Sequence, residues 1–270
     1  MAKANNHRKY RSRYLCLILS FSMTALFPAS QGLTAGKTVS TLHLADKALW
    51  EMNYQKADSL YTSELQQNPE NVELYWKMSR LQVSQGESIN SENSDLRLQH
   101  YRKAAEYARK AISLDSTNAK GHTWLAASLG IMADKIGTKE KLKRAGEIKK
   151  EIDTALRLNP NDETALSMLG SYYREAANIG WFRRMVGNTF IGDVPEGNFE
   201  LAEKAFRKSI SLDSRIIRNY HELALIDLEN DRKEEAILLM KTALDKPILT
   251  ASDRRRIEEM RRLLKKLSRQ

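Results

Sequence analysis

Hydrophobic residues recur along most of this chain at the three- and four-residue spacing of amphipathic helices. A segment that begins at Thr138 carries apolar residues on one helical face, at Leu142, Ala145, Ile148, Ile152 and Ala155. A segment that begins at Ser94 repeats the pattern, with Leu98, Tyr101, Ala104 and Ala108. Serine and threonine both cap helices well, so the pattern predicts a long helix from each of these two residues.

The composition supports a helical chain with a buried core. Of the 270 residues, 41% are hydrophobic and 29% are charged, which is typical of a globular protein. Five prolines and twelve glycines are too few for an all-β sandwich or barrel, which needs a turn about every 8–12 residues. The single cysteine, Cys16, excludes an intramolecular disulfide framework and a zinc site built from thiolates.

Four stretches of the chain share one pattern, a helix rich in alanine or isoleucine that ends in Asn-Pro or Asp-Ser. They lie at 57–71, 104–118, 148–162 and 202–214, and a fifth at 236–243 lacks the closing dipeptide. The pattern resembles the tetratricopeptide repeat, a helix–turn–helix unit of about 34 residues. The resemblance implies an all-α, right-handed helical solenoid of about five irregular helix pairs. Aligned on the closing dipeptide, the repeats begin near residues 38, 72, 119, 163 and 217 and fill a domain at 31–250.

The eighth position of each repeat supports this alignment. In the repeat family, a small residue at that position lets two helices pack closely together. The five repeats all have a small residue there, namely Ala45, Ser79, Ala126, Gly170 and Ala224. We therefore expect Gly170 to be a structural residue, because a larger side chain would force two helices apart.

Three of the repeats are longer than the family unit. In the third repeat both helices are simply longer, and in the second a polar loop at 86–93 precedes the helix that begins at Ser94. The fourth repeat contains the segment 179–197, which mixes large apolar residues with four glycines. There we expect a short helix near 181–186 followed by an ordered loop.

A narrower resemblance follows from the residues around the fourth repeat. They form a helix rich in lysine and isoleucine before Asn-Pro, a helix with Leu-Gly, and then a segment with tryptophan, arginine and proline. They are Lys149, Lys150, Ile152, Leu158 to Pro160, Leu169, Gly170, Glu175 to Ala177, Trp181, Arg183, Arg184, Phe190, Pro195, Ala202 to Phe206, Leu212 and Asp213. Over about residues 45–267 the chain resembles the regulator of microtubule dynamics family. The resemblance implies structural roles for Gly170, Trp181, Arg183, Arg184, Phe190 and Pro195.

The N-terminus has the layout of a secretory signal peptide. Residues 1–13 contain five basic residues and no acidic one, residues 14–27 carry no charge, and small and turn-forming residues follow. We expect 1–30 to be a signal peptide, or alternatively 14–27 to be an uncleaved membrane anchor. The chain would then be a bacterial-type relative of the family that is exported to the periplasm, secreted, or anchored in a membrane.

The net charge of +10 is concentrated at the two ends of the chain. Residues 31–250 carry equal numbers of basic and acidic residues, so no nucleic-acid partner is expected. Residues 251–270 form a basic amphipathic helix, with apolar positions at Ile257, Met260, Leu263, Leu264 and Leu267. We expect this helix to cap the last repeat, and alternatively to bind anionic lipid or an acidic partner through its basic face.

No catalytic or metal-binding motif emerges from the remaining residues. The five histidines are widely scattered and no pair has the spacing of ligands on one helix face. Gly187 and Gly192 have the spacing of a phosphate loop, but Asp193 follows where the loop requires lysine. We therefore expect no catalytic residue, no metal and no cofactor, and we expect that the chain is not an enzyme.

The repeat resemblance implies a concave groove lined by the first helix of each repeat. Its inward positions would be Glu73, Trp76, Arg80, Lys120, Thr123, Ser167, Ser171, Arg174, Arg218 and His221. A tryptophan beside arginines is typical of a binding hot spot for a protein or peptide. The alternative is that the long inserts fill the groove and that Trp76 is packed in the core.

Three hypotheses for the function follow. The first is an exported or membrane-associated scaffold, without enzymatic activity, that binds a protein or peptide in its groove. The second is a membrane-held assembly factor that contacts lipid or an acidic partner through its basic ends or, if the family resemblance is literal, a microtubule-associated regulator. The third is an enzyme built on a helical scaffold.

Overall fold

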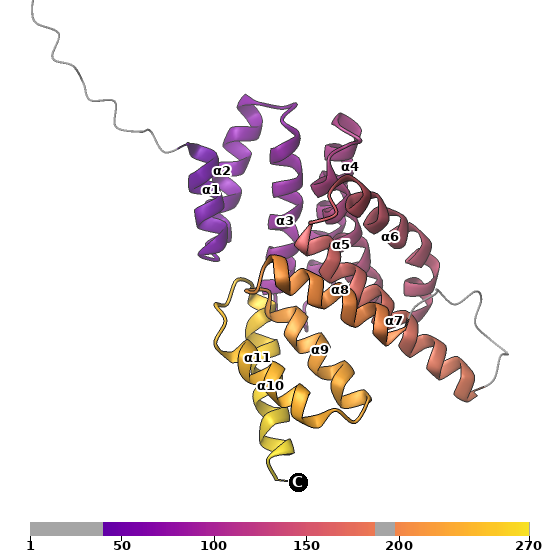
Figure 1. Ribbon diagram of the computed structural model, residues 1–270. Coiled ribbons are helices and arrows are strands. Elements are labelled where there is room, and N and C mark those ends of the chain that lie inside the picture. The colour runs from indigo at the N-terminus through magenta and orange to yellow at the C-terminus, as the bar shows by residue number, and fades with distance from the viewer. Residues whose placement is uncertain (1–39, 187–197, 270) are drawn as a thin grey trace, which may run out of the picture. The chain divides into compact units, whose positions relative to one another are not determined.

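The computed structural model describes residues 40–186 and 198–269, and at residues 138, 142 and 179–186 it describes only the backbone. Over these residues the chain is entirely helical. Five helix pairs follow one another and a single helix ends the chain (Figure 1). The pairs are α1 (Thr41–Trp50) with α2 (Tyr54–Gln67), α3 (Val72–Ser88) with α4 (Ser94–Leu114), α5 (Ala119–Ile136) with α6 (Thr138–Leu158), α7 (Glu163–Val186) with α8 (Phe199–Leu212), and α9 (Ile217–Glu229) with α10 (Lys233–Leu244). The final helix is α11 (Ala251–Leu267).

The helices pack as a solenoid. Each helix packs most extensively against its partner in the pair, and consecutive pairs are joined by contacts of α2 with α3, α4 with α5, α6 with α7 and α8 with α9. The first helices also touch one another in succession, because α3 contacts α5, α5 contacts α7 and α7 contacts α9. The predicted all-α, tetratricopeptide-like solenoid is confirmed.

The closing dipeptides explain where the helices start. Asn68 ends α2, and three residues later the Asn71 side chain accepts a hydrogen bond from the backbone N–H of Glu73 and starts α3. Asn118 starts α5 in the same way, through the N–H of Gly121 at 2.9 Å. A side-chain oxygen at this position satisfies an N–H group that the helix itself leaves unpaired. Asp162 starts α7 in the same way, so α3, α5 and α7 begin at residues 72, 119 and 163. Helix α9 begins at residue 217 after Ile216, which forms no side-chain cap.

The small residue at the eighth position of each repeat is buried where two helices meet. Ala45, Ser79 and Ala126 are fully buried. At Gly170 a Cβ atom would lie 2.7 Å from two ring atoms of Phe206, which is closer than such atoms can approach. A glycine at this point allows α7 to pack directly on α8.

The loop in the second repeat is shorter than the sequence suggests. Helix α3 continues through Gly86 to Ser88, and Asn93 rather than Ser94 precedes α4. Gly86 lets α3 lie close to α4 there, because a Cβ atom would be 2.5 Å from the Tyr101 ring. The prediction of a loop from 86 to 93 was too long by the last turn of α3.

The first helix of the fourth repeat is also longer than predicted. The short helix predicted near 181–186 is the end of α7, which continues without a break from Glu163 to Val186. Gly180 alone does not end a helix that has no proline and no new cap. Trp181, Arg183 and Arg184 thus lie on the last turns of α7. The predicted loop, with Phe190 and Pro195, lies outside the described residues, as does the predicted signal peptide or anchor.

Helix α11 covers the open end of the array. It packs against α9 and α10, and buries Ile257 and Met260 in the apolar cluster of those helices. Its first turn is fixed by Thr250 and Asp253, which form a capping box. The same helix also contacts α3, far away in the sequence. None of the described helices combines the length and the apolar character needed to cross a lipid bilayer.

Candidate functional site

The first helices of the pairs and α11 surround a cavity of about 810 Å³, which we call the central cavity. Acidic and basic side chains line it in equal number, together with serines and tyrosine. Its apolar wall is formed by residues of α3, α5, α6 and α7, including Val83, Trp124, Ala127, Ile148, Ile152 and Met168. This size and mixture of side chains is typical of a ligand-binding cavity.

A smaller cavity of about 660 Å³ lies between α1 and α3, and we call it the side cavity. Trp50, Trp76 and Arg80 line both cavities, so the two share a wall. The Arg80 guanidinium carbon lies 5.1 Å from the centre of the Trp50 ring and 5.5 Å from that of Trp76. Both distances fall in the range of cation–π interactions, so Arg80 holds the two indoles in place.

Asp46 fixes the position of Arg80. Its carboxylate accepts hydrogen bonds from Tyr61 Oη at 2.6 Å, Arg80 Nη2 at 2.9 Å and Lys77 Nζ at 2.5 Å. Burial by itself would raise the pKa of Asp46, but the hydrogen bonds from Lys77 and Tyr61 and the charge of Arg80 lower it. The carboxylate therefore stays ionised at neutral pH and keeps Arg80 between the indoles.

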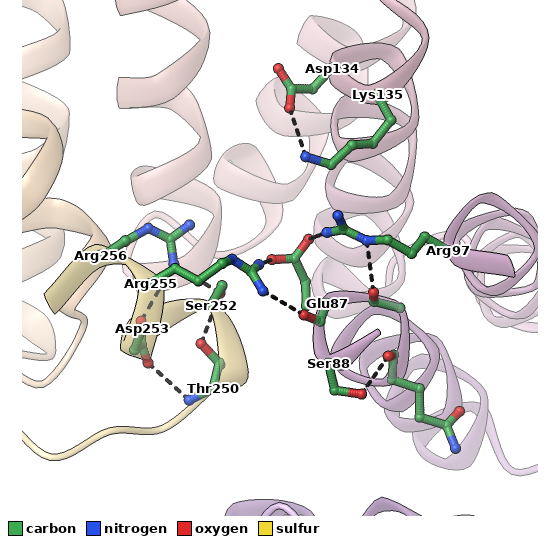
Figure 2. A network of polar contacts seen from close by, with 12 residues as sticks. Glu87, Ser88, Arg97, Asp134, Lys135, Thr250, Ser252, Asp253, Arg255 and Arg256 are labelled. Atoms are coloured by element: carbon green, nitrogen blue, oxygen red, sulfur yellow. Dashed lines mark hydrogen bonds and ion pairs between the residues drawn. The ribbon is translucent and has the colours of Figure 1, made fainter. Parts of the chain in front are cut away.

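Glu87 closes the central cavity between α3 and α11. Arg255 donates to Glu87 twice, from Nη2 to Oε2 at 2.8 Å and from Nη1 to the backbone oxygen at 2.9 Å. Tyr101 and Arg97 donate to Glu87 Oε1 at 2.8 and 3.3 Å. Figure 2 shows the two guanidinium groups on either side of the carboxylate. Burial would raise the pKa of Glu87, but the Tyr101 hydrogen bond and the nearby arginines lower it, so this contact is an ion pair at neutral pH.

The opposite wall is formed by α9 and the rest of α11. Arg218, His221 and Arg256 line it. His221 is buried and its Nε2 lies 3.2 Å from Glu259 Oε2. Burial lowers the pKa of His221 despite the neighbouring acids, so its ring is neutral at pH 7. Arg256 Nη1 donates to Ser252 Oγ at 2.9 Å.

Most of the predicted groove residues are brought together in these two cavities. Glu73 lines the side cavity. The residues that line the central cavity are Trp76, Arg80, Lys120, Ser167, Ser171, Arg218 and His221. Trp76 is partly exposed.

Two predicted residues are not on either wall. Thr123 is fully buried, and its hydroxyl donates to Asp162 Oδ2 at 2.9 Å, so it stabilises the start of α7. Arg174 pairs with Glu222 and Glu229, each at 2.9 Å. Neither residue lies where the groove prediction placed it, and the reason is the same for both. The position of a residue within its repeat gives only the face of the helix on which its side chain lies. Thr123 and Arg174 lie on faces that pack against the next repeat, so their side chains do not reach the cavity wall.

Several cavity residues were missed from the sequence. Trp50 and Asp46 belong to the first repeat, whose inward positions would have identified Asp46. Glu87 lies beyond the usual end of a first helix, on the extra turn of α3. Arg255 and Arg256 come from α11, and no repeat pattern predicts that this helix reaches α3.

Comparison with known proteins agrees with the fold. The family model named regulator of microtubule dynamics protein 1-3 matches residues 41–268. The chain belongs to this family. The family resemblance stated from the sequence is therefore confirmed.

Several members of the family named regulator of microtubule dynamics protein 1 are similar over most of this chain. The Pongo abelii protein is 24% identical over 88% of this chain and 76% of its own length. The Bos taurus protein is 26% identical over 74% of this chain and 63% of its own, and the Caenorhabditis elegans protein is 25% identical over 72% and 84%. Among solved structures, a thermophilic TPR protein of Thermus thermophilus is 18% identical over 82% of this chain and 96% of its own, with a TM-score of 0.57. That likeness supports the repeat fold.

Proposed function

We propose that the chain is a scaffold, without enzymatic activity, that binds a protein segment or peptide along its concave face. The observation that carries the proposal is the stack of Trp50, Arg80 and Trp76 on the wall that the two cavities share. Trp50 is 47% exposed although it is a large aromatic residue. Tryptophan and arginine are the residues most enriched in binding hot spots.

Contacts within the chain already hold the stack together. Asp46 holds Arg80, and Arg80 in turn orders the two indoles. Binding to an ordered surface loses less conformational entropy than binding to mobile side chains. The mixture of acids, bases and apolar residues around the central cavity suits a peptide, which carries polar backbone groups along its whole length.

An array of random peptides tests this function. The full chain is applied to the array, and the dissociation constants of selected fluorescent peptides are measured by anisotropy. Replacing Trp76 by Ala should weaken binding by about 30-fold or more, since hot-spot residues cost about 2 kcal/mol or more when truncated. Tyr75→Ala is the matched control, because Tyr75 is the adjacent aromatic on α3 and lines neither cavity. Equal binding by Trp76→Ala and the parent chain, or no binding to any peptide, would refute the proposal.

A second function, regulation of microtubules, is supported by the names of the relatives. The exposed basic residues in the second half of α11 would provide the contact with an acidic polymer. Co-sedimentation with polymerised tubulin tests this function. The double variant Arg262→Glu with Lys266→Glu should remain in the supernatant, whereas Lys47→Glu, an exposed lysine on α1, should pellet like the parent chain. If the parent chain does not pellet, this function is excluded.

We also propose that residues 1–30 direct export or anchor the chain in a membrane. Five basic residues followed by an uncharged stretch support this proposal. N-terminal sequencing of the native protein should begin between about residues 28 and 36 if the segment is a cleaved signal. A soluble cytosolic form that begins at Met1 or Ala2 would refute export. An exported chain would not meet microtubules, so the same measurement separates the two functions.

A further inference from the structure

Arg218 has an unusual position on the wall of the central cavity. Among the described residues, each of the other lysines and arginines on this wall lies within 3.5 Å of a carboxylate oxygen. Arg218 forms no ion pair and no hydrogen bond with any residue in the described part of the chain, and its Nε is buried. A buried donor without a partner costs free energy that a partner would recover.

Two carboxylates on α9 and α11 that line the central cavity are engaged in other contacts. Glu222 accepts a hydrogen bond from Arg174 at 2.9 Å. Asp253 accepts from the backbone N–H groups of Leu249 and Thr250 at 3.1 and 2.9 Å, which starts α11. Glu259 on α11 also lines the cavity, but in the described part of the chain its closest charged or titratable neighbour is His221, at 3.2 Å, and not Arg218. Arg218 is therefore left without a carboxylate partner.

A second guanidinium group adds to this imbalance. Arg256 belongs to α11, lines the same wall, and is 21% exposed. Burial, and after it the charge of Arg218, lower the pKa of Arg256. The charges of Asp253, Glu87 and Glu222 offset this lowering only in part, so an anion between the two guanidinium groups would stabilise both of them. Figure 2 shows Arg256 beside Ser252, whose hydroxyl it contacts.

We propose that Arg218 and Arg256 bind a carboxylate of the peptide that occupies the central cavity. The inference rests on the proposed peptide-binding function and predicts the orientation of the peptide in the cavity. Its apolar or aromatic side chains would lie against Trp50 and Trp76, and its carboxylate would lie between the two arginines. Guanidinium groups bind carboxylates through paired hydrogen bonds, which an unpartnered Arg218 can offer in full.

The first experiment tests the carboxylate site without any peptide. Melting curves of the full chain are recorded in sodium acetate and in sodium chloride of equal ionic strength. At about ten times its dissociation constant, acetate should raise the melting temperature of the parent chain by about 3–6 °C. Arg218→Gln should abolish the rise and Arg218→Lys should retain part of it. Arg215→Gln is the matched control, because Arg215 lines the same cavity but is paired with Asp213.

The same curves separate binding from a structural role. In chloride, Arg218→Gln should melt at or above the temperature of the parent chain, because the substitution removes repulsion with Arg256 and breaks no contact. A fall of the melting temperature in chloride would show that Arg218 stabilises the fold and would overturn the inference. An equal acetate response in the parent chain and Arg218→Gln, or no response in either, would overturn it as well.

The second experiment identifies the source of the carboxylate. A peptide selected on the array is compared with versions in which its C-terminus is an amide or its acidic residues are neutral. One of these changes should weaken binding about 10- to 100-fold in the parent chain and have no effect in Arg218→Gln. If peptides bind and Trp76→Ala weakens them but neither change matters, the inference fails while the proposed function stands. If acetate raises the melting temperature in a way that requires Arg218 but no peptide binds, a peptide is excluded as the source of the carboxylate. The proposed peptide-binding function is then excluded as well.

Discussion

Gly170 provides the sharpest test of how the repeats pack. It lies on α7 where that helix meets α8, and a Cβ atom there would be 2.7 to 2.8 Å from three ring atoms of Phe206. The Phe206 ring is fully buried among Ala202, Leu223 and Ile226, so it has no space into which it can move. Any side chain at 170 must therefore push α7 and α8 apart or force the ring out of its preferred rotamer.

Two opposing effects determine how much Gly170→Ala changes the free energy of unfolding. Alanine favours a helix over glycine by about 1 kcal/mol, and overpacking costs about 1–3 kcal/mol. The expected net change is a destabilisation of up to about 2 kcal/mol. Gly170→Leu adds three more carbon atoms at the same contact and should cost about 2–3 kcal/mol. For a chain of this length such a loss lowers the melting temperature by about 4–12 °C.

The matched controls are Gly130→Ala on α5 and Gly146→Ala on α6. A Cβ atom at either glycine meets no atom within 4 Å, so only the helix preference acts. Both variants should be more stable than the parent chain by about 0.5–1 kcal/mol in urea unfolding. The sign of the change therefore separates crowded from open glycines. If Gly170→Ala raises stability as much as Gly130→Ala, the contact of α7 with α8 is not as described and the reasoning fails.

Three further outcomes follow from the contacts. The pKa of Glu87 is lowered from its ordinary value of 4.5, so its ion pair stabilises the fold at neutral pH and is lost as acid protonates the carboxylate. Glu87→Gln should therefore flatten the fall in melting temperature below pH 4.5. Asp162 is fully buried and accepts hydrogen bonds from Thr123, Lys120 and two backbone N–H groups, so Asp162→Ala should cost about 2–4 kcal/mol in urea unfolding. Deleting residues 252–270 exposes the apolar cluster of α9 and α10, and should increase amide hydrogen exchange first in those helices.

Local chemistry explains why so much of the fold could be predicted from the sequence. The segments that close the first three repeats, such as Asn68 to Asn71, both end one helix and cap the next. A signal of this kind acts over four residues and does not depend on the rest of the structure. The lengths of α3 and α7 were underestimated because a loop was predicted from residue 86 and a separate short helix near 181–186. The glycine at position 86 serves the close contact of α3 with the Tyr101 ring of α4, and a contact between two helices leaves no local signal in the sequence.

The candidate site could be predicted only in part for a related reason. Repeat positions give the direction of a side chain relative to its own helix, and Trp76, Arg80 and Arg218, selected in this way, line the central cavity. They do not give the distance to the next repeat, and so Thr123 was expected in the cavity although it is buried against Asp162. Contacts between residues 168 positions apart, such as that of Glu87 with Arg255, leave no periodic signal in the sequence.

Helix α11 has three roles, although its sequence shows a single basic amphipathic pattern. Its apolar side covers the last pair of helices, which is the capping role expected of a terminal helix in a solenoid. Its first turns contribute Arg255 to the closure at Glu87 and Arg256 to the wall beside Arg218, so these two basic residues belong to the cavity. Other basic residues of α11, such as Arg254, Arg262 and Lys266, are exposed and do not line the cavity, so they can face a partner outside it. The proposed carboxylate site therefore combines Arg218 of the last repeat with Arg256 of a helix outside the repeats. A substitution at Arg256 should weaken binding of a carboxylate while Ile257 and Met260 continue to cover the last repeat.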